Sequence, residues 1–140
     1  MSNQNIQLAI RYYAALNARD FGAYDQIFSP NVEIEGVGGA RGTGIEAVKA
    51  FDRVWVDGAS NFKIHGIFHV GDGDRVVCHN RAEGIHDGVL RLPGGDVPAT
   101  GRTIGGVYFA AFQIRAERIA TALIYFDRMV IAEQLGVVPH

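Results

Sequence analysis

The stretch FKIHGIFHVGDGDRVVCHNRAEGIH, residues 62–86, decides the fold of this chain. Hydrophobic and polar residues alternate along most of it with a period of two, which is typical of β-strands. Gly71-Asp72-Gly73-Asp74 interrupts the alternation with a sequence that favours a turn. The stretch therefore predicts a β-hairpin with strands at 62–70 and 75–86.

A second hairpin is predicted towards the C-terminus, with strands at 103–115 and 118–127. The connection between the hairpins, residues 86–101, is rich in glycine and proline and predicts a long loop. After the last strand, residues 128–135 predict a helix that Gly136 ends as a C-cap.

The N-terminal half predicts mainly helices. Asp20 is a favoured N-cap for a short helix that Ser29-Pro30 ends. Thr43 and Glu46 fit a capping box at the start of a longer helix that carries Val48, Phe51, Val54 and Trp55 on one face. The same half predicts an amphipathic helix at 3–17 and a strand at 32–36.

Helices followed by two long hairpins indicate an α+β fold, in which a curved antiparallel sheet wraps around the N-terminal helices. The whole chain, residues 1–140, is expected to form one domain. Because helices fill the concave face of such a sheet only partly, we expect a pocket there, and this pocket is the natural place for function.

Composition excludes several classes of protein. Thirteen Lys and Arg against fifteen Asp and Glu give a net charge of −2, which argues against a nucleic-acid or anionic-membrane partner. No apolar run approaches the roughly 18 residues of a membrane-spanning helix, and the N-terminus lacks the pattern of a signal peptide. Cys78 is the single cysteine, so no intrachain disulfide is possible. We expect a soluble cytoplasmic protein.

Four segments of the chain carry a resemblance to a known family. They are GDGDRVV at 71–77, EGIHDG at 83–88, PATGR at 98–102 and IATALIYFDRMVIAEQLG at 119–136. The chain resembles the SnoaL-like polyketide cyclases, which belong to the cone-shaped nuclear transport factor 2-like superfamily. The resemblance implies an apolar cavity, no metal, no organic cofactor and one acid/base carboxylate. The implied reaction is an intramolecular aldol condensation that closes a polyketide ring.

The carboxylate of the family lies on the last strand and matches Asp127. In an apolar enclosure its pKa should rise towards the working pH, as suits a group that takes and returns a proton. The alternative is that Asp127 only N-caps the helix at 128–135. His86 is the second catalytic candidate, as a proton shuttle or orienting group, unless it is a solvated histidine that opens the loop.

The candidate substrate-binding residues share a predicted position on the wall of the pocket. The family's usual tryptophan in the last strand is replaced around Leu123, and its usual bulky residue in the 75–86 strand is replaced by Asn80, so the lining and the substrate differ from the family pattern. The predicted lining residues are Tyr13, Trp55, Asn80, Gln113, Leu123 and Tyr125.

The expected function is therefore cofactor-independent acid/base catalysis, by a cyclase or a related isomerase or lyase, on a hydrophobic enolisable carbonyl compound. One alternative is a non-catalytic small-molecule-binding domain. Another is a hydrolase that resembles limonene epoxide hydrolase and uses Arg81, Glu83 and Asp127. No metal is expected, because His65 and His69 are four strand residues apart, or roughly 13 Å, too far to bind one ion.

The segment VYFAAF at 107–112 is apolar on both faces of its predicted strand. A strand with one solvated face should alternate, so the second face is expected to be covered by another subunit. The family resemblance also favours a dimer through the outer face of the sheet. The sequence therefore predicts a homodimer.

Overall fold

A computed structural model describes residues 2–36 and 39–137. Its helices are α1 (Ser2–Ala18), the 3-10 turn η1 (Phe21–Ala23), α2 (Tyr24–Ile27), α3 (Ile45–Gly58) and α4 (Arg128–Leu135). Its strands are β1 (Phe28–Glu35), β2 (Arg41–Thr43), β3 (Lys63–Asp72), β4 (Arg75–Ile85), β5 (Leu90–Leu92), β6 (Gly95–Val97), β7 (Thr103–Arg115) and β8 (Arg118–Tyr125). No helix within the described ranges is long and apolar enough to cross a membrane.

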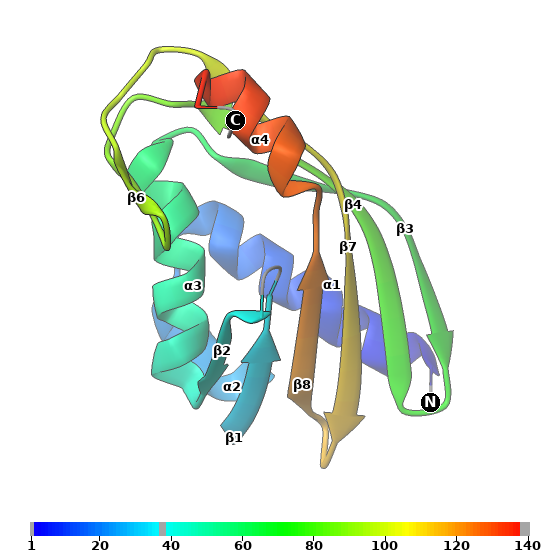
Figure 1. Cartoon of the computed structure of the whole chain (residues 1–140). Coiled ribbons are helices and arrows are strands. Elements are labelled where there is room, and N and C mark those ends of the chain that lie inside the picture. Colours follow the sequence, from blue (N-terminus) through cyan, green and yellow to red (C-terminus); the bar gives the residue numbers. More distant parts are fainter. Residues whose placement is uncertain (1, 37–38, 138–140) are drawn as a thin grey trace.

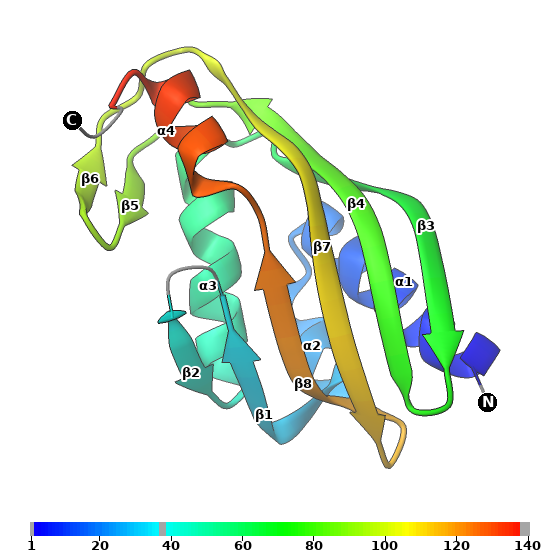
Figure 2. The ribbon, with the colours of Figure 1, turned by 45° about the vertical axis from the view of Figure 1, so that its right-hand side comes forward.

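Six of these strands form one curved sheet in the order β2-β1-β8-β7-β4-β3. The sheet curls around α1 and α3, which lie on its concave side, and α4 lies at one end of it (Figures 1 and 2). This arrangement confirms the α+β, cone-shaped fold. The sheet is mixed, however, because β1 runs parallel to β8. No tight turn joins these two strands, so nothing forces them to run in opposite directions.

Two predicted helix signals do not operate as expected. The N-cap of α3 is Gly44, with φ 96° and no side-chain hydrogen bond, so the capping box of Thr43 and Glu46 is wrong. Ser29-Pro30 does not end a helix but lies within β1. The pairing of β1 with β8 shifts register between Phe28 and Glu33, and a proline is tolerated in a strand at such an irregularity.

The alternation in β4 is as predicted. Val76, Cys78, Asn80 and Ala82 are buried on the concave side, and the residues between them face outwards. The neighbouring strand β3 departs from simple alternation, because its register shifts between Gly66 and Phe68. Four residues of regular strand would leave His65 and His69 on one face, but the shift separates them: His65 pairs with exposed Arg81, whereas His69 pairs with buried Cys78.

The convex face of the sheet carries exposed apolar side chains on four adjacent strands. On this face the His79 ring stacks on the Phe109 ring, with 4.6 Å between the ring centroids, and meets the Phe68 ring edge to face, with 4.9 Å between the centroids. We call the set the outer-face patch: Phe68, Val70, Val77, Val107, Phe109 and Tyr125, each between 41% and 55% exposed. Contiguous apolar surface of this kind marks interaction sites.

The outer-face patch makes the expected homodimer testable. At micromolar concentration the chain should sediment at twice its 15.2 kDa mass. Phe109→Lys places a charge at the patch and should yield monomers, because burying an unpaired ammonium costs several kcal/mol. Ile10→Lys, at an exposed apolar position of α1, is the matched control and should leave the dimer intact. A wild-type monomer would end the hypothesis.

Candidate active site

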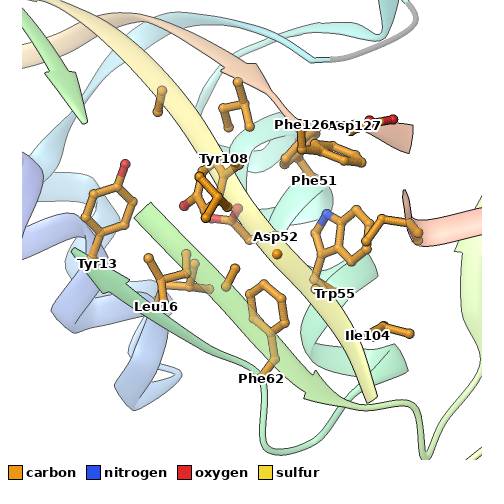
Figure 3. Close-up of a pocket in the computed structure, with 18 of the residues that line it drawn as sticks. Tyr13, Leu16, Phe51, Asp52, Trp55, Phe62, Ile104, Tyr108, Phe126 and Asp127 are labelled. Carbon is orange, nitrogen blue, oxygen red and sulfur yellow. The ribbon is translucent and has the colours of Figure 1, made fainter. Parts of the chain in front are cut away.

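A cavity of about 280 Å³ lies between the concave face of the sheet and helices α1, α3 and α4 (Figure 3). Its size is near the lower end of the roughly 300–1,000 Å³ common for small-molecule sites. Gly105 of β7 lines the cavity. Its φ of 133° lies in a region that favours glycine, and a Cβ at this position would clash with the carbonyl oxygen of Ala82. The largest apolar lining residues are Leu16, Phe51, Trp55, Phe62, Ile104 and Phe126.

Asp52 of α3 places a carboxyl group in this cavity, although its residue is only 4% exposed. The Tyr12 hydroxyl of α1 donates to both carboxyl oxygens, at 3.0 Å from Oδ1 and 2.9 Å from Oδ2. The Tyr24 hydroxyl of α2 donates to Oδ2 at 2.6 Å. Three helices thus converge on one carboxyl group.

Burial governs the ionisation of Asp52. It raises the pKa of this carboxyl from 3.8 to about 7, and the hydrogen bonds from Tyr24 and Tyr12 partly offset the rise. Burial and the neighbouring Asp52 charge also raise the pKa of Tyr12 and of Tyr24, so both phenols remain donors at neutral pH. A carboxyl group with a pKa near 7 is suited to take up and return protons.

Sequence reasoning missed Asp52, although a signal was present. Val48, Asp52 and Trp55 follow the spacing i, i+4, i+7, so the aspartate lies on the apolar stripe of α3. An isolated acid in such a stripe needs a buried partner. Those partners, Tyr12 and Tyr24, are 40 and 28 residues away in the sequence, and only the fold brings them together.

A second set of polar side chains lies at the β4 side of the cavity. Tyr13 and Tyr108 line the cavity, and Asn80, the cross-strand partner of Tyr108, is completely buried. Burial raises the pKa of both phenols, and the Asn80 amide acts in the opposite direction and lowers it. Even so, the Tyr13 hydroxyl and both polar atoms of Asn80 lack hydrogen-bond partners among the described residues.

Asp127 lies at the edge of the cavity and is exposed. Its carboxylate N-caps α4, with Oδ1 accepting from the Met129 amide at 2.9 Å, as the alternative interpretation expected. Figure 3 shows this carboxylate directed away from Asp52. The expected dry enclosure around Asp127 is wrong, because β8 ends at Tyr125 and the chain turns into α4 at the surface.

His86 is buried but does not line the cavity. Its Nδ1 lies 2.9 Å from the Thr100 hydroxyl and accepts from the Thr100 amide, and its Nε2 lies 3.2 Å from the Val97 carbonyl oxygen. This ring therefore ties the β5–β6 region to the end of β4, and it is neither a solvated residue nor part of the pocket wall.

The other predicted lining residues divide between the two faces of the sheet. Tyr13 and Trp55 line the cavity as expected, and Trp55 packs on Phe62 and Phe126. Leu123 and Tyr125 of β8 pair with Ala111 and Phe109 and lie on the convex face. Gln113 lies away from the cavity, where its amide donates to Asp74 at 3.4 Å.

The residues of the epoxide-hydrolase alternative do not come together. Arg81 and Glu83 are exposed on the outer side of β4, whereas Asp127 lies at the edge of the cavity on the concave side. Within the described residues, no group of three or more His, Cys, Asp or Glu side chains has an arrangement that could hold a metal ion.

The chain has the α+β cone-shaped fold of nuclear transport factor 2-like structures. Residues 6–135 match the SnoaL-like polyketide cyclase family, and the chain belongs to that family. A comparison with proteins of curated function gives no match.

Solved structures resemble the chain over almost its whole length. A protein from Jannaschia species CCS1, assigned as a SnoaL-like polyketide cyclase, has a TM-score of 0.87 and 20% identity over 99% of this chain and 96% of its own. IdmH from Streptomyces antibioticus, assigned as a polyketide cyclase, has a TM-score of 0.80 and 22% identity over 96% and 99%. An epoxide hydrolase of M. tuberculosis has a TM-score of 0.73 and 19% identity over 96% and 90%.

The raised pKa of Asp52 makes a prediction about stability. Between pH 3.8 and about 7 the folded state keeps a proton that the unfolded chain has released, so the free energy of unfolding falls as pH rises. The stabilising contribution of the proton on Asp52 is fully present below pH 3.8 and is lost as the pH rises through about 7. The free energy of unfolding then falls by at most about 1.4 kcal/mol per pH unit. Asp52→Asn should lack this slope in urea denaturation.

Asp25→Asn removes the same formal charge from an exposed position of α2 and serves as the control. Parallel pH profiles for the wild type and Asp52→Asn would contradict the assignment of this slope to Asp52.

Proposed function

We propose that this protein is a cofactor-independent acid/base enzyme that acts on a hydrophobic, enolisable carbonyl compound, with Asp52 as the proton carrier. The observation that carries the proposal is the Asp52 carboxyl group inside an apolar cavity, held by the Tyr12 and Tyr24 hydroxyls. Membership of the SnoaL-like polyketide cyclase family supports catalysis of this class. An aldol-type cyclisation is the reaction we name.

The proposed steps balance within one substrate. Ionised Asp52 takes the proton next to the carbonyl group, the C–H electron pair becomes the enolate, and the enolate carbon forms a C–C bond with a second carbonyl of the same molecule. The new alkoxide takes the proton back from Asp52. Among the described residues Oδ1 accepts from Tyr12 alone, which leaves it room to receive the proton. In an isomerase the proton returns to a different carbon.

Asp127 is the alternative proton carrier that the family resemblance implies. Its position at the edge of the cavity allows contact with a bound ligand. Its side chain, however, already caps α4, and water reaches it. Losing water raises the pKa of a carboxyl group, so the enclosed Asp52 is better placed for proton transfer at neutral pH.

A non-catalytic binding domain would use the same cavity without moving a proton. Exchange of substrate protons with solvent separates the two functions. A suitable probe is 2-tetralone, a flat bicyclic ketone with acidic protons beside its carbonyl group, followed by NMR in D₂O. The proposed enzyme accelerates this exchange, and a binding domain does not.

Asp52→Asn should reduce the exchange rate by about 100-fold or more, the scale of general-base catalysis. Asp127→Asn is the matched control, because asparagine also caps helices and α4 is preserved. It should keep most of the exchange activity. The reverse pattern would transfer the proton-carrying role to Asp127, and no acceleration by the wild type would refute the proposal.

The pH profile gives a further prediction. Because ionised Asp52 is the base, exchange should rise with pH and level off above about pH 7. The Tyr24 hydroxyl lowers the pKa of Asp52, so Tyr24→Phe should move the midpoint to higher pH. The Asp52 carboxyl resonance, followed by NMR, should move with it. An unchanged midpoint would show that another group titrates.

A further inference from the structure

We infer that the hydroxyls of Tyr13 and Tyr108, oriented by Asn80, bind the oxygen atom of a neutral carbonyl or phenolic ligand in the cavity. This inference rests on the proposed function, in which the reacting group of the ligand is a carbonyl group. It assigns a separate place to the ligand oxygen, at the β4 side of the cavity.

The first argument is the missing hydrogen bonds. The Tyr13 residue is 6% exposed and Asn80 is fully buried, yet the Tyr13 hydroxyl and both Asn80 amide atoms lack partners among the described residues. Most buried side-chain polar atoms in proteins have a partner, because an unpaired one costs stability. A ligand oxygen at Tyr13 would supply the partner that the described residues do not.

The second argument is the position of the two phenols. Tyr13 and Tyr108 both line the cavity, and Figure 3 shows both among the side chains around Asp52. Asp52 and Tyr108 line the same cavity, and the charge of Asp52 contributes to the raised pKa of Tyr108. A carbonyl oxygen held by the phenols brings the adjacent C–H bonds towards the base, and the same donors stabilise the enolate oxygen.

Asn80 supports this arrangement from behind. It faces Tyr108 across the β4–β7 pair, and its amide is close enough to Tyr13 and Tyr108 to affect both phenols. It does not line the cavity, so it acts on the ligand through the tyrosines as a positioning residue.

Charge restricts the ligand to a neutral group. Among the described residues that line the cavity, Asp52 and Asp127 are acidic and none is Lys or Arg. An anionic carboxylate would meet like charge without a compensating cation, whereas a ketone or phenol needs only donors. The apolar volume of about 280 Å³ suits a fused bicyclic ring system.

The test compares two ligands that differ by one oxygen. Isothermal titration should show that 2-tetralone binds the wild type about tenfold or more tightly than tetralin, which has the same two rings without the carbonyl group. Tyr13→Phe should remove most of this preference and leave tetralin binding unchanged. Equal affinities in the wild type, no binding of either ligand, or a preference that survives Tyr13→Phe would overturn the inference.

Stability separates a binding role from a structural one. Tyr13→Phe and Asn80→Leu delete unpaired polar atoms, so both variants should melt at the wild-type temperature or above it, while the ketone preference is lost or reduced. Asn31→Leu, on the exposed side of β1, is the matched control and should change neither property. A lower melting temperature for Asn80→Leu with an unchanged preference would show that Asn80 is structural and would remove it from the site.

Failure of this inference can be told apart from failure of the proposed function. Asp52→Asn should keep the preference for 2-tetralone and lose proton exchange. If the wild type shows the preference but never accelerates exchange, the oxygen site stands and the enzymatic proposal fails.

Discussion

The buried carboxyl group of Asp52 is the constraint on which the arrangement of the helices depends. An unpaired charge at this depth would cost several kcal/mol, and a carboxyl group requires donors even when it is neutral. Tyr12 and Tyr24 supply them from α1 and α2, so the three helices meet where both hydroxyls reach one side chain. A well-packed apolar residue at this point would often be at least as stable, so stability alone does not account for an acid here, which agrees with the proposed chemical role of Asp52.

The same packing separates the two acids near the cavity into different environments. Asp52 is enclosed, and its pKa is raised by burial. Asp127 is exposed and accepts a hydrogen bond from the Met129 amide at the start of α4. When the environments of two carboxyl groups differ in this way, the enclosed group is the better candidate for exchanging protons near neutral pH. Asp127 then has a clear structural role at the junction of β8 and α4.

Local patterns in the sequence predicted most of the fold. β7 and α4 have the predicted bounds, and the buried residues of β4 alternate as expected. The errors arose where distant contacts decide the outcome. Leu123 and Tyr125 were predicted to line the pocket, but their pairing with Ala111 and Phe109 turns them outwards, and β8 ends at Tyr125, before Asp127. The family resemblance implies Asp127 as the acid/base group, whereas the enclosed carboxyl group of Asp52 depends on phenols from two other helices.

The polar groups of the cavity also differ in how completely the protein satisfies them. Asp52 is fully supported by the chain, which fixes the base before any ligand arrives. The Tyr13 hydroxyl and the Asn80 amide are buried without partners in the part of the chain that the structure describes, which leaves donors free at a defined place. A rigid base beside unsatisfied donors is the division of roles that enolisation needs, because the base must be preorganised while the oxygen site must gain its best partner only in the complex.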